Sequence, residues 1–254
     1  MRKWLLIIGI MAIIVVLIAW RMPARLVLQP AQARLPAVDW SNANGTAWSG
    51  SVDGFSYKGI QLGTLEWEFD GIEDLGSQLT RWIIHSYGPQ HDVRARLTLT
   101  PEGEIRRAAE VRGHLPASWV DVSDKLPLLY LEGLIELDLE HIELDRNLPV
   151  NGSGRVTWSQ AAISGGANEQ FGKLRLNLVP KTADRPDGMT FAVRSLEPAD
   201  ISMQGEGHIL RNDYDIDLKL EIALERDDLM QFMQQIGGEV GPGLYRFAWQ
   251  GQIR

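Results

Sequence analysis

Hydrophobic and polar residues alternate with a period of two through most of the chain beyond residue 40. The longest such run is DYDIDLKLEIAL at residues 213–224, where tyrosine, isoleucine and leucine fill nearly every second position and charged residues fill most of the others. Because successive side chains of a β-strand point to opposite faces, this run predicts a long strand with one buried face and one solvated face. The same alternation predicts strands at TLEWEF (64–69), DVRARLTLT (92–100), GLIELDLEHIEL (133–144), GRVTWS (154–159), KLRLNL (173–178), MTFAV (189–193) and YRFAWQG (245–251).

Short clusters of turn-forming residues separate these predicted strands. They are Asp70-Gly71, Pro101-Glu102-Gly103, Asn151-Gly152, Gly165-Gly166, Asp187-Gly188 and Arg211-Asn212-Asp213. Strands joined by such short connections predict an antiparallel meander. The apolar phase slips after Leu139, which predicts a β-bulge where the strand bends. Glycine contributes 25 of the 254 residues, a tenth of the chain against an ordinary share of about 7%, and strongly bent sheets tolerate such a content.

Two segments follow a helical period instead, and a third is long enough for one turn. Residues 227–238 place apolar side chains at i, i+3, i+4 and i+7 behind a capping aspartate and before Gly237-Gly238, which predicts a helix. Residues 74–86 repeat this spacing and predict a second helix, and residues 116–120 predict a single turn. We expect such short helices to cover the open end of the sheet core.

The first twenty residues have a different character. Residues 4–20, WLLIIGIMAIIVVLIAW, carry no charge and would span about 26 Å as a helix, close to the thickness of the hydrocarbon core. Arg2 and Lys3 precede this run, which favours a cytoplasmic N-terminus. The alternative is a cleaved signal peptide, because Ala31-Gln32-Ala33 has the small-x-small form of a cleavage site. We favour an uncleaved anchor, since the apolar run is longer than a usual signal-peptide core.

These patterns predict four regions and one fold class. The regions are a cytoplasmic tip (1–3), a transmembrane helix (4–20), an extended or partly helical stalk (21–40) and an exported β-domain (41–254). The fold class is all-β with a few short helices, in which the N-terminal transmembrane helix precedes a curved antiparallel meander sheet. A groove, a sandwich and an open barrel each bury one face of such a sheet, so the pattern leaves all three open.

Charge and cysteine content narrow the function. Residues 1–34 hold five Lys/Arg and no acid, so the remaining residues hold 20 basic and 33 acidic side chains, a net charge of −13. Such a domain repels nucleic acid and anionic lipid surfaces. The chain has no cysteine, which excludes disulfides, thiolate metal sites and cysteine nucleophiles.

Residues for catalysis are scarce, and we assign none to a catalytic, cofactor-binding or metal site. The five histidines (His85, His91, His114, His141 and His208) lack the spacing of a zinc site. Asp213, Asp215 and Asp217 share one strand face, where a solvated surface is favoured over a calcium site. The sequence therefore predicts a protein that is not an enzyme and has no cofactor.

Three tryptophans, Trp67, Trp158 and Trp249, are in phase with the apolar positions of their predicted strands. The simplest interpretation is that all three belong to the core. The alternative is that some of them line an apolar groove that is open to a lipid or to a partner strand. The alternation alone does not separate these two interpretations.

A short motif, NGTAWSG at residues 44–50, opens the β-domain, and an ordered series of strand motifs follows it. The series is LGTLEWEFDG, LEGLIELDLEHIEL, VNGSGRVTWSQAAIS, FGKLRLNL and DLMQFMQQIGGEVGPGLYRFAWQGQI. This series resembles the type II secretion system protein N family over the whole chain. Within NGTAWSG, Gly45 and Gly50 allow the chain to turn into and out of a short strand, and we expect Trp48 to be an apolar plug that fastens this edge to the core.

The resemblance implies a single-pass protein of the cell inner membrane, with its bulk in the periplasm, that takes part in protein transport across the outer membrane. It implies other subunits of the type II secretion system as partners, in a non-catalytic role in assembly. We expect docking at an unpaired sheet edge and take the outermost strand to be 245–253. The alternative function is an envelope protein that binds or transfers lipid in a β-groove, since the family is similar in character to repeating β-groove proteins.

Overall fold

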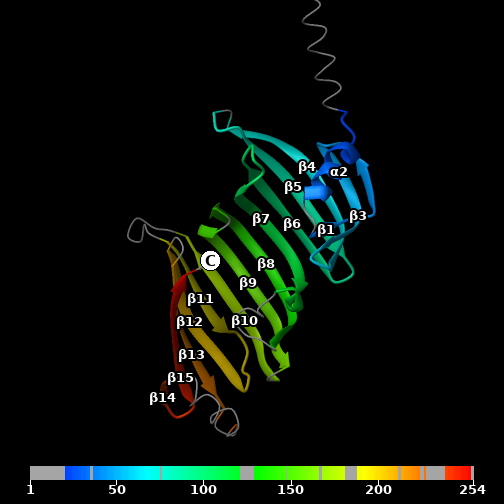
Figure 1. Ribbon diagram of the computed structural model, residues 1–254. Helices are drawn as coiled ribbons and strands as arrows, with labels where there is room; N and C mark the ends of the chain where they lie inside the picture. The colour runs from blue at the N-terminus through cyan, green and yellow to red at the C-terminus, as the bar shows by residue number, and fades with distance from the viewer. Residues whose placement is uncertain are drawn as a thin grey trace, which may run out of the picture.

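A computed structural model of the protein describes residues 21–34, 37–74, 76–120, 129–146, 148–165, 168–180, 188–210, 213–223, 226 and 238–252. Within these residues, fifteen strands form a single sheet (Figure 1). The chain enters the sheet through helix α2 (Ala24–Arg34), and the 3-10 turn η1 (Ala117–Trp119) follows the seventh strand. The all-β fold predicted from the sequence is confirmed.

The strands follow one another along the chain. They are β1 (Val38–Asp39), β2 (Asn42–Gly45), β3 (Ser49–Tyr57), β4 (Ile60–Asp74), β5 (Leu79–Gly88), β6 (His91–Leu99), β7 (Ile105–Pro116), β8 (Leu129–Asp145), β9 (Leu148–Gly165), β10 (Glu169–Val179), β11 (Met189–Ser195), β12 (Ile201–Leu210), β13 (Asp213–Ile222), β14 (Gly238–Gly241) and β15 (Leu244–Gln252).

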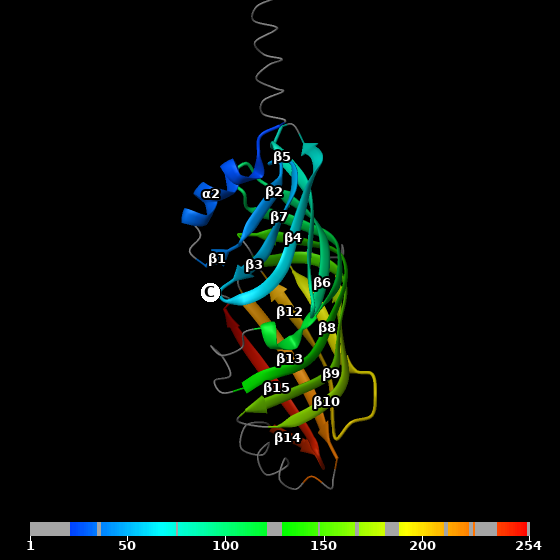
Figure 2. The same ribbon diagram turned by 90° about the vertical axis from the view of Figure 1, so that its right-hand side faces the viewer.

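The topology is a meander in which every pairing is antiparallel. From β3 to β13 each strand pairs with its neighbours in sequence, and the order then runs β13-β15-β14. Figure 2 shows how the sheet bends along its length. Among the described residues the two edges do not pair with each other. The sheet is therefore open and curved, which corresponds to the groove among the three architectures that the sequence left open.

One face of this sheet carries a continuous cross-strand row of mostly apolar residues. Register places one residue of each strand from β3 to β13, and then of β15, side by side. The row is Val52, Leu65, Ser86, Val93, Gly113, Leu137, Val156, Leu176, Val193, Gly205, Leu218 and Phe247. At about 4.8 Å between strands, this row is roughly 50 Å long. The alternation seen in the sequence therefore becomes one apolar face opposite one charged face.

The most tightly packed part of the apolar face lies toward the C-terminal end. Ile201, Leu220, Ile222, Tyr245 and Phe247 form the buried cluster there, drawn from β12, β13 and β15. Strands β13 and β15 each contribute two alternate residues to the cluster, as the period-two pattern requires, and β12 contributes Ile201, with partly buried Met203 packed against it. The core thus fixes β15 firmly on β13.

Bulges interrupt the ladder where the sheet bends. The predicted bulge after Leu139 is confirmed, because Leu139 pairs with Gly154 and His141 with Ser153, which leaves one extra residue on β8. Gly113 on β7 has φ +141°, and a Cβ there would lie 1.8 Å from the carbonyl oxygen of Asp92. Only glycine permits this backbone and this close approach of β6 to β7.

Two kinds of sequence prediction are wrong. The helix expected at 74–86 is the hairpin of β4 and β5, in which Trp82 pairs with both Phe69 and Leu97. Strand β5 is rich in aromatic and β-branched residues, which favour a strand. The turns expected at Asp70-Gly71 and Asn151-Gly152 lie inside β4 and β9.

The remaining helical predictions have different outcomes. The single turn at 116–120 is confirmed as η1, and α2 lies within the segment 21–40 that was predicted to be an extended or partly helical stalk. The segments 4–20 and 227–237 lie outside the described residues. In the part of the chain that the structure describes, no helix is long and apolar enough to cross a bilayer.

Candidate functional site

The N-terminal edge of the sheet is covered by short strands. Strand β2 pairs with β3 from Gly50 to Asp53, and β1 pairs with Ser56 and Tyr57. Helix α2 packs beside β2, where the Arg25 Nε donates to the carbonyl oxygen of Ala43 at 3.0 Å. Short strands covered by a helix leave little backbone for another chain to pair with.

The C-terminal edge is different, because its outermost strand is very short. Residues 245–253 were predicted to be the outermost strand, but β14 lies outside β15 and pairs with it from Leu244 to Arg246. Among the described residues, nothing pairs with the outer side of β15 beyond Arg246. We call residues 247–252 the open edge of β15.

The direction of the backbone groups along the open edge follows from one hydrogen bond. The N–H of Ile222 donates to the carbonyl oxygen of Gly243 at 2.8 Å. Since bonded and non-bonded pairs alternate in an antiparallel ladder, the odd-numbered residues of β15 bond to β13. The N–H and C=O groups of Ala248 and Gln250 therefore point away from the sheet, and both residues are exposed.

An ion pair and stacked rings hold this strand in place. Arg246 donates from Nε and Nη2 to the two carboxylate oxygens of Asp217, at 2.9 and 2.6 Å. This bidentate contact lowers the pKa of Asp217 and raises the pKa of Arg246. On the opposite face, Phe247 stacks on Trp249 with ring centroids 5.5 Å apart. The open edge is thus presented by a strand that is rigidly supported from one side.

The NGTAWSG motif forms the opposite corner of the sheet. Gly45 has φ +83°, and Gly50 lies so close to Trp67 that a Cβ there would be 2.7 Å from the indole ring. The Trp67 Nε1 donates to the carbonyl oxygen of Ala47 at 3.2 Å. Trp67 therefore closes the β2–β3 turn, and the two glycines make room for the turn and for the ring.

Trp48 does not have the buried position expected from the sequence. Its side chain is 36% exposed. It packs edge-on against Phe69 at 5.3 Å and stacks with Trp82 at 6.3 Å. These rings lie at the N-terminal end of the sheet, far along the strand order from the buried cluster of β12, β13 and β15. Trp48 is part of a surface aromatic cluster and not an interior plug.

The three tryptophans predicted for the core are in the predicted phase but are not buried. Register places them on the apolar face, beside Ile84, Leu174 and Ile216. Trp67 and Trp158 are half-buried, and Trp249 is 49% exposed. The prediction of phase is confirmed, whereas the prediction of burial is wrong because the apolar face of an open sheet is only partly covered.

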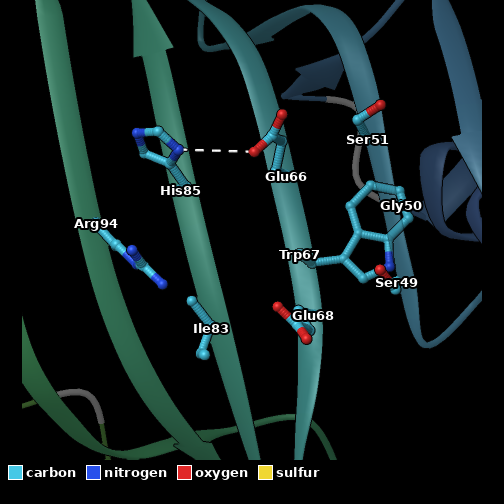
Figure 3. Close-up of a pocket in the computed structure, with 9 residues that line it drawn as sticks. All are labelled: Ser49, Gly50, Ser51, Glu66, Trp67, Glu68, Ile83, His85 and Arg94. Carbon is cyan, nitrogen blue, oxygen red and sulfur yellow. Dashed lines mark ion pairs between the residues drawn. The ribbon is translucent and has the colours of Figure 1, made fainter.

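The charged face carries a hollow of about 400 Å³ over β3 to β6 (Figure 3). His85 lies between two carboxylates there, with Nδ1 3.7 Å from Glu66 and Nε2 2.9 Å from Asp92. Tyr87 donates to Glu66 at 3.0 Å, and this contact raises the pKa of Tyr87. Both nitrogens of His85 face acids and not a hydroxyl that the imidazole could activate, so the arrangement is a surface charge network.

The network continues across β4 to β8. Glu73 accepts hydrogen bonds from the Thr98 hydroxyl and from Arg107, each at 2.7 Å, and these donors lower the pKa of Glu73. Asp70 lies 3.2 Å from Arg96 and 3.7 Å from Arg81. Such ion pairs between partly exposed side chains link neighbouring strands, and their charges make this face of the sheet a solvated surface.

The five histidines stand on five strands, β5, β6, β7, β8 and β12. Asp213 and Asp215 are exposed on β13, and Asp217 lies on the same face, as predicted for a solvated strand surface. In the described part of the chain, no group of three or more histidine and acidic side chains could hold a metal ion. The assignment of no catalytic, cofactor or metal residue stays a prediction.

Sequence reasoning placed an unpaired edge strand at 245–253, which corresponds to β15, but it missed β14, which covers the first part of this strand. The signal that it used was alternation, which identifies a strand but not its neighbours. Ala248 and Gln250 lie on either side of Trp249, and whether their outward backbone groups have a partner depends on the length of β14.

Comparison with known proteins gives one match. The family model described as type II secretion system (T2SS), protein N, matches residues 36–248, which is most of the chain. No curated protein and no solved structure matches the chain significantly.

Proposed function

The chain belongs to the type II secretion system protein N family, and we propose that it is a non-catalytic assembly subunit that docks to another subunit through the open edge of β15. Membership makes other components of the secretion system the expected partners. We place the protein in the cell inner membrane as a single-pass protein, with residues 4–20 as the anchor, its N-terminus cytoplasmic and the sheet in the periplasm. The uncharged segment before Arg21 supports this placement.

The observation that carries the proposal is the contrast between the two edges. The N-terminal edge is covered by β1 and β2, whereas beyond Arg246 the outer side of β15 has no partner among the described residues. An added strand that pairs with Ala248 and Gln250 would satisfy their outward N–H and C=O groups. Because β15 is fixed to β13, a partner strand would meet an ordered template.

Crosslinking in cells tests this docking with a matched control. Ala192, Glu206, Asp217 and Ala248 lie in one cross-strand row. The two alanines are both exposed, but Ala192 is inside the sheet and Ala248 is at its edge. A photo-crosslinking amino acid at Ala248 is expected to give adducts with another secretion subunit, and the same amino acid at Ala192 is not. Equal adducts at both positions would contradict edge docking.

A proline at the same position separates docking from folding. Ala248→Pro removes an outward N–H, so it should leave the β13–β15 ladder intact and abolish adducts from a crosslinker at Gln250. Ala248→Val keeps the N–H and is the control. Docking through the edge is refuted if Ala248→Pro melts at the temperature of the parent protein and still gives full adducts.

A second candidate function is lipid binding, which the apolar row from Val52 to Phe247 favours. Several residues of this row, including Leu176 and Val156, are only half-buried, so part of a long apolar face is accessible. A crosslinker at Leu176 would then capture phospholipid in cells, and one at Asn177 on the opposite face would not. Protein adducts alone from Leu176 would count against a lipid role.

A further inference from the structure

The outer surface of α2 is apolar although the helix is already packed on the sheet by another face. Ala24, which is 1% exposed, and half-buried Leu28 form the packed side. Leu26, Val27 and Pro30 of the helix are exposed, and so is Pro23, which directly precedes α2. Together these residues have the i, i+3, i+4, i+7 spacing of a single helix stripe. We call these four residues the α2 stripe.

The exposure of the stripe is substantial. Leu26 is 59% exposed and Val27 is 41% exposed. Two further exposed apolar residues, Met22 and Trp48, lie at the same corner, where the N–H of Ala47 donates to the carbonyl oxygen of Met22 at 2.8 Å. An amphipathic helix fixed by one face and apolar on another has a surface ready to bind something apolar.

The distribution of charge along the chain indicates what the α2 stripe binds. Residues 1–34 hold five basic residues and no acid, whereas the rest of the chain has a net charge of −13. A basic apolar helix is attracted to anionic headgroups, and an acidic body is repelled by them. The basic charge of α2 is therefore complementary to an anionic bilayer surface.

The position of α2 along the chain also favours a membrane surface as its binding partner. The uncharged run 4–20 ends one residue before Arg21, and α2 begins three residues later. Figure 1 places α2 at the end of the sheet where the described chain begins. A helix this close to an anchor lies within reach of the interface that the anchor crosses.

We propose that the α2 stripe lies in the interfacial layer of the same membrane that residues 4–20 cross, with Leu26 and Val27 at the depth of the headgroup and acyl boundary. The proposal rests on the membrane anchoring in the proposed function. Contact through α2 would hold β2 and β3 at the membrane and direct the other end of the sheet away from it. The open edge of β15 would then be presented at a distance from the bilayer.

The absence of cysteine allows a direct test with the full chain. Single cysteines are introduced as Leu26→Cys, Val27→Cys, Gln29→Cys and Val240→Cys, and each is labelled with a nitroxide. Gln29 is exposed on the same helix but outside the stripe, and Val240 is an exposed apolar residue on β14. The labelled chains are placed in nanodiscs of phosphatidylethanolamine and phosphatidylglycerol, and collisions with oxygen and with a water-soluble nickel complex are measured.

The expected result is a severalfold higher ratio of oxygen to nickel collisions at positions 26 and 27 than at positions 29 and 240. If the chain is in the disc but all four labels are equally accessible to nickel, the stripe does not bind the bilayer, while the anchoring stands. If the chain does not enter discs, the anchoring itself fails and the present proposal with it. A crosslinker at Leu26 that captures a protein in cells, and no phospholipid, would replace the bilayer with a protein partner.

Discussion

Replacing Gly113 with alanine tests whether the close approach of β6 and β7 depends on glycine. Gly113 lies in the middle of the sheet, where it pairs with Val93 on β6 and Leu137 on β8. Its φ of +141° is strained for alanine, and the new Cβ would lie 1.8 Å from the carbonyl oxygen of Asp92. No side-chain rotation relieves this clash, since both atoms belong to fixed positions of the backbone.

The magnitude follows from two separate costs. A residue held in an unfavourable backbone region costs about 1–3 kcal/mol, and forcing apart a packed contact costs roughly another 1–3 kcal/mol. Gly113→Ala should therefore lower the free energy of unfolding by about 2–6 kcal/mol. This is a large share of the total stability of an ordinary domain, about 5–15 kcal/mol.

Gly103→Ala is the matched control. Gly103 also has a positive φ, +87°, but nothing lies within 4 Å of the position that a Cβ would occupy. It should bear only the backbone cost of about 1–3 kcal/mol. Urea unfolding of the full chain in non-ionic detergent, followed by tryptophan fluorescence, gives both values. Equal losses in the two variants would refute the argument from close approach.

Three further predictions concern an ion pair, an aromatic cluster and a buried histidine. Arg226→Ala removes the Nη2 that donates to both carboxylate oxygens of Glu169, whose side chain is only 13% exposed, and should cost about 1–3 kcal/mol. In the same urea assay, Arg112→Ala should cost under about 1 kcal/mol, because both Arg112 and its partner Asp138 are exposed. Trp48→Ala should cost about 2 kcal/mol, less than the 3–5 kcal/mol of a fully buried ring, and an unchanged melting temperature would show that its ring contacts carry no stability. Burial lowers the pKa of His91, so protonation of this side chain opposes folding. The free energy of unfolding should therefore be constant above about pH 6.5 and decrease as the pH falls below that value. His91→Gln should remove this pH dependence, and a pH dependence that persists in the variant would assign it to another group.

The strands were predictable because period-two alternation is a local property. In β13 and β8 the alternating positions decide which face is buried. Even the bulge after Leu139 could be predicted, because it shifts the apolar positions of the alternation by one residue. The hairpin of β4 and β5 was misread because Trp82 and Ile83 put apolar side chains on both faces of β5, which imitates helical spacing. Asn151-Gly152 was misread as a turn because a long strand in a curved sheet also uses such residues at a bend.

The candidate site was less accessible to sequence reasoning, for a different physical reason. The docking potential of Ala248 depends on which backbone groups lack a partner, and this is set by where β14 ends and not by the side chain. Trp48 was expected to be buried because large aromatic side chains usually are. An open sheet has a corner at each end, and a ring at a corner has neighbours on one side only.

The meander order has a consequence for how the fold responds to damage. From β3 to β13 each strand depends on the strands immediately before and after it in sequence, so the sheet behaves as a one-dimensional array with nearest-neighbour coupling. Fraying should start at an end and advance strand by strand, and a chain shortened at its C-terminus should lose β15 and β13 while β3 to β9 keep their pairing. Strands could therefore be added or lost at the end of such a sheet without a change in the pairing of the remaining strands.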